Sequence, residues 1–195
     1  MKYVKILGLL AVAAAALMAF AGSASADSAT SPTGTTYTGE IVAEAEGHAV
    51  LDNPIAKIEC ASKVSGTISG HGAGKAVSGT ISSLTFGSPV GTCTDEWHVT
   101  VVNAGSLSVN GITGSYNGDA FSTGATVEAT RFGITCRYAT NNTTIGTVTG
   151  GSPATLDISA SIPFHSGSIF CGSGATAWTG NYKVTTPGSL YIDKN

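Results

Sequence analysis

Three titratable side chains, Asp95, Glu96 and His98, form the group in this chain with the most evident chemical potential. In a strand that starts early, Glu96 and His98 project from the same face, because side chains alternate along a strand. Such a group could bind a metal ion or serve as an acid/base pair. A metal site needs three or four convergent ligands, and the sequence identifies no others. We therefore interpret the group as an exposed charged turn at the start of a strand, and we predict no metal and no cofactor.

The motifs of the common hydrolases do not occur in the sequence. There is no Gly-x-Ser-x-Gly, no His-Glu-x-x-His and no phosphate-binding loop, although a catalytic triad can be assembled in any chain order. Glycosidases use two opposed carboxylates, and the Asp and Glu residues offer many pairs without a distinguishing spacing. These observations favour a protein that is not an enzyme and leave a small glycan hydrolase as the alternative.

The four cysteines all follow residue 26. An even number of cysteines in an exported protein favours disulfides over metal ligation, and four cysteines allow three pairings. Proximity favours Cys60 with Cys93 and Cys136 with Cys171. Each such bridge would close a loop of about 35 residues and contribute on the order of 3 to 4 kcal/mol to the free energy of unfolding.

The aromatic side chains are candidates for a sugar-binding surface. Trp97 and Trp178 each follow a cysteine closely, so we expect both to pack on the core beside a disulfide. The tyrosines are the better candidates for exposed platforms on which a sugar ring could stack. We predict four candidate surface aromatics: Tyr116, Tyr138, Tyr182 and Tyr191.

Residues 1–26 have the features of a secretory signal peptide. Two lysines precede a run of apolar residues, and Ala24-Ser25-Ala26 offers a cleavage site before Asp27. The apolar run is short for a membrane span, and no later segment is apolar enough to form a helical one. The sequence therefore predicts a secreted, extracellular protein that begins with a flexible arm over residues 27–35.

Charge and composition limit the possible partners. Loss of the two signal-peptide lysines takes the formal net charge from −3 to −5, which disfavours binding to nucleic acid. Only 11% of the residues are charged. Solubility must therefore depend largely on Ser, Thr, Asn and Gly, a composition common in exported β-proteins.

Apolar and polar residues alternate in many short segments, whereas no segment repeats apolar residues at helical spacing. The clearest strand is 154–164, whose apolar face consists of Leu156, Ile158, Ala160, Ile162 and Phe164. Over residues 77–86 the apolar phase slips, which predicts a β-bulge near Ser82 and Ser83. Further strands are predicted over residues 37–45, 56–61, 64–69, 97–102, 106–109, 126–131, 134–138, 144–149, 178–184 and 189–192.

About ten short strands at this spacing predict an all-β fold, either an antiparallel β-sandwich or a closed barrel. We expect a single domain over residues 36–195, because the segment 110–123 between its halves lacks a proline-rich or charged spacer. The halves, approximately 47–110 and 124–192, share an order of landmarks at offsets of 76 to 83 residues: Cys, Gly-Thr-x-x-Gly, Cys, Trp and Gly-Ser-Leu. This order predicts an internal duplication.

The segment Thr186-Pro187-Gly188-Ser189-Leu190-Tyr191, together with the Cys, Cys, Trp order, resembles small exported Gly/Ser/Thr-rich β-proteins of high-GC Gram-positive bacteria. The resemblance covers most of the chain after residue 26. Those proteins are uncharacterised, so the resemblance implies export and β-structure, and it brings no activity, cofactor or site residue.

Taken with the missing motifs, these features favour a secreted, non-catalytic β-protein that acts as a binding or structural module outside the cell or in the cell envelope. A small secreted glycan hydrolase is the alternative. A small membrane β-barrel, which also needs alternating strands, ranks below both. The sequence identifies no partner, although a cell-wall glycan, another extracellular glycan or a protein would fit.

Overall fold

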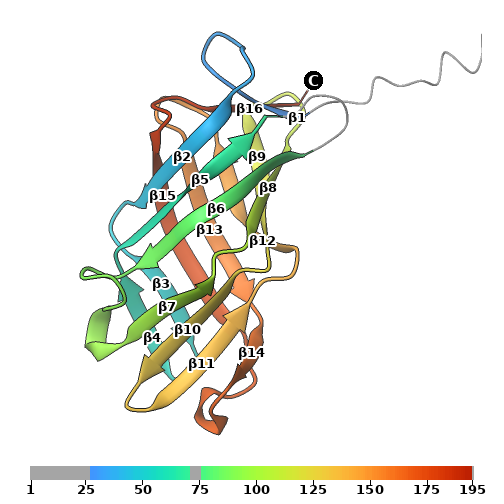
Figure 1. Cartoon of the computed structure of the whole chain (residues 1–195). Helices are drawn as coiled ribbons and strands as arrows, with labels where there is room; N and C mark the ends of the chain where they lie inside the picture. The colour runs from blue at the N-terminus through green and yellow to red at the C-terminus, as the bar shows by residue number, and fades with distance from the viewer. Residues whose placement is uncertain (1–26, 71–75, 195) are drawn as a thin grey trace, which may run out of the picture.

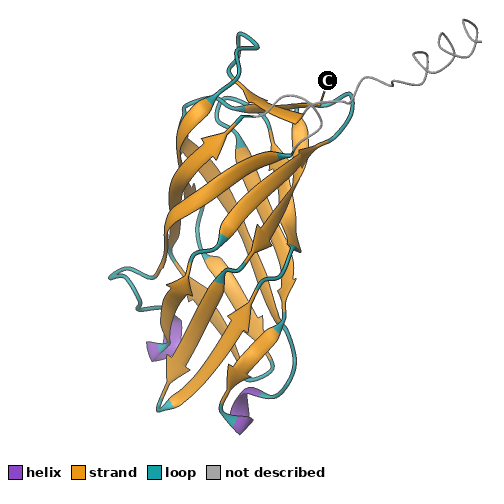
Figure 2. Cartoon of the chain, turned by 45° about the vertical axis from the view of Figure 1, so that its right-hand side comes forward, coloured by secondary structure: helices purple, strands orange, loops and turns teal. Residues whose placement is uncertain are grey.

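The structure is a computed structural model that describes residues 27–70 and 76–194. The regular elements of this part are β-strands and two single turns of 3-10 helix, so the all-β prediction is confirmed (Figure 2). In the same ranges no helix has the length and apolar character needed to cross a membrane. The predicted signal peptide lies outside the described residues.

Eight antiparallel strands close into a barrel, which forms the upper part of the molecule in Figure 1. Pairing of the first and last strands of the series closes the ring, with Ile158 opposite Gly180. The closed barrel is one of the two predicted architectures. In order around the ring the strands are β13 (Thr155–Ile162), β12 (Thr143–Thr149), β9 (Asn117–Thr123), β8 (Ser106–Gly111), β6 (Val77–Phe86), β5 (Ser62–Ser69), β2 (Thr38–Ala45) and β15 (Thr176–Thr186).

Two packed layers continue the molecule below the barrel. One layer extends the barrel sheet from β15 through β3 (Ala49–Asn53) and β4 (Ala56–Cys60). The other is a separate sheet of β7 (His98–Asn103), β10 (Thr126–Arg131), β11 (Ile134–Ala139) and β14 (Phe164–Gly167). Side chains of both layers belong to the same hydrophobic core as the barrel.

One disulfide ties these layers together, and a second fixes the segment after β14 to β11. Cys60 in β4 is bonded to Cys93, which precedes the 3-10 turn η1 (Thr94–Glu96) and the strand β7. Cys136 in β11 is bonded to Cys171 in the 3-10 turn η2 (Ile169–Cys171), which leads into β15. The pairing favoured by proximity is therefore confirmed.

The strands β1 (Asp27–Thr30) and β16 (Tyr191–Lys194) pair with each other at the upper end of the barrel (Figure 1). The prediction of a flexible arm over residues 27–35 is wrong for β1, since Ala29 is fully buried. The Asp27 Oδ2 atom also accepts a hydrogen bond from the backbone N–H of Gly111. The segment Asp-Ser-Ala-Thr contains one apolar residue, so its composition did not reveal a buried strand.

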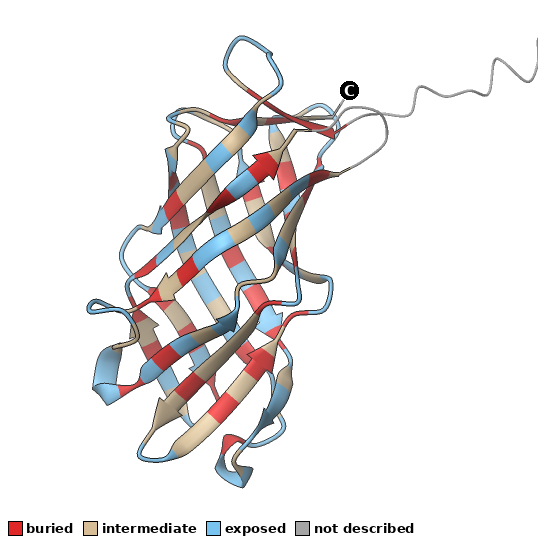
Figure 3. Cartoon of the chain, in the orientation of Figure 1, coloured by how far each residue is buried: buried red, intermediate tan, exposed pale blue. Residues whose placement is uncertain are grey.

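The alternating pattern correctly predicts which faces of the strands are buried (Figure 3). In β13, Ile158 and Ala160 are buried while Asp157 and Ser159 are exposed. The predicted bulge in β6 is also present. Its register shifts because Ser83 pairs with Ser65 whereas Ile81 pairs with the next residue, Gly66, which leaves Ser82 as the extra residue.

The structure does not show the predicted repeat. Trp97 precedes a strand of the four-stranded sheet, whereas Trp178 lies inside the barrel strand β15. Gly105 leads into the barrel strand β8, whereas Gly188 leads into β16 at the upper end. The landmarks thus lie in unlike elements, and the duplication stays a prediction.

Candidate functional site

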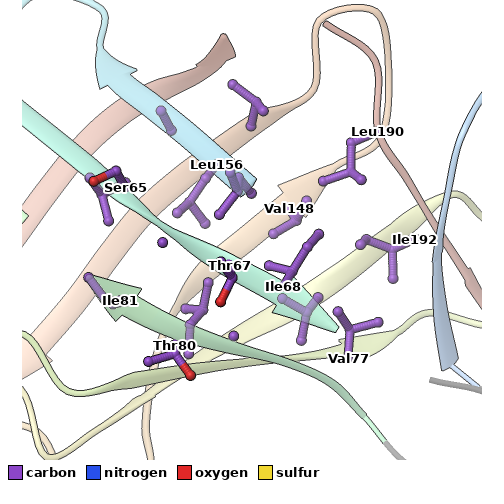
Figure 4. Close-up of a pocket in the computed structure, with 18 residues that line it drawn as sticks. Ser65, Thr67, Ile68, Val77, Thr80, Ile81, Val148, Leu156, Leu190 and Ile192 are labelled. Carbon is purple, nitrogen blue, oxygen red and sulfur yellow. The ribbon is translucent and has the colours of Figure 1, made fainter. Parts of the chain in front are cut away.

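The interior of the barrel is apolar and nearly filled. Figure 4 shows side chains such as Ile68, Val148 and Leu156 converging on a cavity of about 60 Å³. A smaller void of about 40 Å³ is also lined by barrel strands, and one of about 30 Å³ lies between the two lower layers. An apolar cavity that binds benzene has a volume of about 150 Å³. The barrel interior is therefore a packed core rather than a ligand pocket.

The predicted group of Asp95, Glu96 and His98 lies on the surface at η1 and the start of β7. Asp95 and Glu96 both have positive φ angles, 53° and 60°, in the turn that precedes Trp97, which is only 4% exposed. The group is thus an exposed turn beside a buried tryptophan. Across the part of the chain that the structure describes, no three His, Cys, Asp or Glu side chains gather closely enough to hold a metal ion.

Two of the four tyrosines predicted to lie on the surface are buried, and for these the prediction is wrong. Tyr138 is 4% exposed and packs edge to face on Phe164, with 6.0 Å between the ring centroids. Tyr182 is 1% exposed, and its hydroxyl donates a hydrogen bond of 2.8 Å to Ser62 Oγ. Both occupy inward positions of their strands, and burial raises the pKa of both phenols.

The other aromatic residues divide between surface and core. Tyr116 is exposed and packs edge to face on Tyr191, with 5.4 Å between the ring centroids. Trp178 is half-buried and contacts Phe86 and Tyr182 inside the molecule. Both tryptophans therefore pack on the core, which confirms this part of the prediction.

Four large apolar side chains are exposed at the distal end of the molecule, the end opposite β1 and β16. Ile55 lies in the β3–β4 turn, Phe132 lies in the β10–β11 turn, and Ile169 and Phe170 lie in η2. Their exposed fractions are 43%, 79%, 90% and 64%. The β10–β11 turn and the segment after β14 are adjacent at the bottom of Figure 1. We call these four residues the distal tip.

Three turns that carry the distal tip form one structural unit. Cys171 fixes η2 to β11 through its disulfide, and the Ser168 N–H donates a hydrogen bond of 3.0 Å to the carbonyl of Thr135. The β3–β4 turn lies against the segment after η2, because a Cβ atom on Gly174 would approach Pro54 Cγ to 3.2 Å. The exposed side chains are therefore presented by a braced surface.

Phe132 occupies a backbone conformation that suits other residues better. Its φ is 49° and that of Gly133 is 78°, so both residues of this two-residue turn are left-handed. Such turns favour Asn-Gly, and a side chain like Phe pays a steric cost of about 1 to 2 kcal/mol. The ring contacts the Arg131 guanidinium, whose Cζ lies 4.6 Å from the ring centroid. Because burial does not explain this choice of residue, the strain points to a function.

A polar groove of about 380 Å³ lies between the β10–β11 turn and the segment that leads into η2. Its side chains supply hydroxyl groups and one ion pair, in which Arg137 Nε donates to Glu128 Oε1 at 2.8 Å. Glu128 is the one carboxylate among the residues that line the groove. The lining consists of Glu128, Gly133, Thr135, Arg137, Ser166, Gly167 and Ser168. Gly133 and Ser168 directly adjoin Phe132 and Ile169, so the groove runs beside the distal tip.

A second depression, of about 520 Å³, lies on the outer wall of the barrel across β2, β5, β6 and β8. Seven of its eleven lining residues carry a hydroxyl group, and the lining contains no charged and no aromatic residue. It therefore lacks the stacking platform that sugar rings use. Its hydroxyl groups belong to Thr38, Thr67, Ser69, Ser78, Thr80, Ser106 and Ser108.

Comparison with known proteins finds no matching family model, no matching curated protein and no matching solved structure. The distal tip was not predicted from the sequence, although two features of the sequence point to it. Phe132-Gly133 separates two predicted strands, and Ile169-Phe170 lies in a segment between strands where polar residues are the rule.

Proposed function

We propose that this protein is a secreted, non-catalytic binding module that attaches, through its distal end, to a component of the cell envelope or the extracellular space. The distal tip carries the proposal. It places four large exposed apolar side chains at one end of the molecule, and exposed apolar groups of this kind are typical of surfaces that contact a partner or a membrane. Here the tip is held in place by a disulfide, so local flexibility does not explain why these side chains are exposed. The tip also includes a strained and exposed phenylalanine, whose presence core packing does not explain.

Other features support this function. Both disulfides suit an oxidising compartment outside the cytoplasm. The filled barrel leaves no interior space for a carried ligand, so recognition is expected on the outside.

The alternatives receive less support. A glycan hydrolase needs two opposed carboxylates, whereas the groove is lined by Glu128 alone, held by Arg137. A membrane barrel needs an apolar outer band. The barrel strands instead turn residues such as Asp157 and Ser159 outward and bury Ile158.

Hydrogen exchange tests the proposal directly. The protein from Asp27 onward is mixed with isolated cell envelopes, and amide exchange is followed by mass spectrometry. We expect slower exchange in peptides that cover residues 131–138 and 164–175, with little change in barrel peptides.

A matched pair of variants controls for unspecific adhesion. Ile169→Ser/Phe170→Ser should abolish the protection, because it removes half of the distal tip. Ile112→Ser/Tyr116→Ser removes exposed apolar side chains from the opposite end and should leave the protection from exchange unchanged. Protection that is absent, or that survives the first variant, would contradict the proposal.

A further inference from the structure

Resting on the proposed function of the distal end, we propose that the partner of the distal tip is a lipid bilayer, into whose interfacial region Phe132, Ile169 and Phe170 insert. Aromatic and aliphatic side chains on the apolar face of a peripheral protein enter the boundary between headgroups and acyl chains. The three residues suit this role because each is more than half exposed and each lies at the apex of a turn.

The arrangement of apolar and polar groups favours a bilayer over a protein partner. The distal tip does not form a continuous apolar patch, because the polar groove lies between the turn of Phe132 and the segment that leads to Ile169. A tight protein interface would bury that groove in its dehydrated centre. At a bilayer surface, water and headgroups can solvate the groove while the side chains on either side enter the apolar layer.

Charge at the distal end indicates that insertion, not electrostatic attraction, supplies the binding. Arg131 lies beside Phe132, and its Nε atom is buried without a hydrogen-bond partner within the described residues. A lipid phosphate could approach the rest of this guanidinium. The lower part of the molecule also carries Asp95 and Glu96 in η1, which oppose attraction to anionic lipid. We therefore expect binding to zwitterionic lipid that depends little on salt.

The bracing of the tip increases the affinity that a few side chains can provide. The disulfide to Cys171 and the hydrogen bond from Ser168 hold η2 in place before binding. Less conformational freedom is then lost on insertion. The left-handed two-residue turn likewise sets the backbone of Phe132 before binding.

Co-sedimentation with phosphatidylcholine vesicles tests this proposal. We expect the protein from Asp27 onward to bind, with an affinity that changes by less than about twofold between about 0.1 M and 1 M NaCl, although the Debye length shortens from about 10 to 3 Å. Phe132→Asn should weaken binding without unfolding the chain, because Asn suits a left-handed turn. The triple variant Phe132→Asn/Ile169→Ser/Phe170→Ser should bind at least about tenfold more weakly. Ile112→Ser/Tyr116→Ser at the opposite end should bind like the wild type.

Several results would overturn the lipid proposal. Wild-type protein that ignores vesicles but protects residues 131–138 and 164–175 on isolated envelopes would keep the binding function and exclude lipid as the partner. Binding that requires anionic lipid and disappears in high salt would show an electrostatic mechanism instead. A dimer in sedimentation velocity that dissociates when the tip is substituted would identify a second copy of the chain as the occupant. Protein that binds neither vesicles nor envelopes would contradict the proposed function as well.

Discussion

Tyr138 and Tyr182 are both buried, but only one of their hydroxyl groups has a hydrogen-bond partner. The Tyr182 hydroxyl donates to Ser62 Oγ, whereas the Tyr138 hydroxyl has no partner within the described residues. We expect Tyr182→Phe to lower the free energy of unfolding by about 1 to 2 kcal/mol, and Tyr138→Phe to leave it unchanged or raise it. Urea unfolding of the two variants measures the difference. Equal losses in both would show that Tyr138 finds a partner in solution.

The same two residues predict how stability responds to alkaline pH. Burial raises both phenol pKa values above the ordinary 10.0, so the folded state retains protons that the unfolded state has lost. The unfolded state then binds fewer protons, and stability falls as pH rises. This contribution is fully present below about pH 10 and is lost as pH rises through the folded-state pKa values. The double Phe variant should lose less stability between about pH 9 and 11 than the wild type in denaturant titrations.

Phe132 offers a prediction in which stability and binding change in opposite directions. Phe132→Asn replaces a sterically strained left-handed residue by one that tolerates this conformation, so the free energy of unfolding should rise by about 1 kcal/mol. A thermal melt measures the gain, and Phe132→Ala serves as the control because alanine keeps the strain. A melting temperature that falls for Phe132→Asn would show that the ring packs more tightly than its exposure suggests.

The partners and burial of single residues could be predicted where neighbouring residues in the sequence carry the information. Close spacing in sequence was enough to identify the partners of Cys60 and Cys136. The burial of Tyr182 could also have been predicted, since it is in phase with Trp178 and Val184 along β15. The exposure of Phe132 was harder to predict, because the sequence around an isolated aromatic residue in a turn does not show whether its side chain faces the core or the solvent.

At the scale of elements, the disulfide between Cys136 and Cys171 joins η2 to β11 and thereby positions half of the distal tip. Cys136→Ser/Cys171→Ser should lower the free energy of unfolding by roughly 3 to 4 kcal/mol, because the unfolded chain gains the freedom of a loop of about 35 residues. Amide exchange in peptides covering η2 should also become faster. The control is Cys60→Ser/Cys93→Ser, which should cost a similar free energy and leave exchange in η2 unchanged. Equal acceleration in η2 from both variants would contradict the local role.

Strands with clear alternation, such as β10 and β13, were predicted within a few residues of their ends. The strands β1, β3, β9 and β14 were not predicted. For β1 and β14 the physical reason is that each has only four residues, too few to show an alternating pattern, and each is held by pairing with a strand distant in the chain, β16 and β11 respectively. A strand defined by its partner leaves little trace in its own composition.

At the scale of the whole molecule, sequence could not decide between sandwich and barrel. Both architectures use the same alternating strands, and closure depends on the pairing of β13 with β15 rather than on any local pattern. The structure combines a closed ring above with two packed layers below. The pairing could not be deduced from one chain, because alternation tells which face is buried and not which strand is the neighbour.

The filled barrel gives a prediction for the molecule as a whole. An internal cavity of about 60 Å³ is less than half the size of one that accepts benzene. A fluorescent fatty acid such as cis-parinaric acid should therefore show no saturable binding inside the barrel, and the melting temperature should not rise in its presence. A lipid-binding barrel protein serves as the positive control. Saturable binding that survives the triple tip variant would show that the barrel opens in solution.

For a chain that is secreted as proposed, the order of strand pairing has a consequence for folding after export. β2 pairs with β5, which follows it closely, and with β15, which begins only at Thr176. β1 pairs with β16, further along still. A chain that emerges from a translocation channel N-terminus first therefore carries unpaired strand edges until β15 and β16 have also emerged. Since exposed edges invite aggregation and non-local pairing is slow, a chain exported in this way stays open to aggregation until the barrel closes.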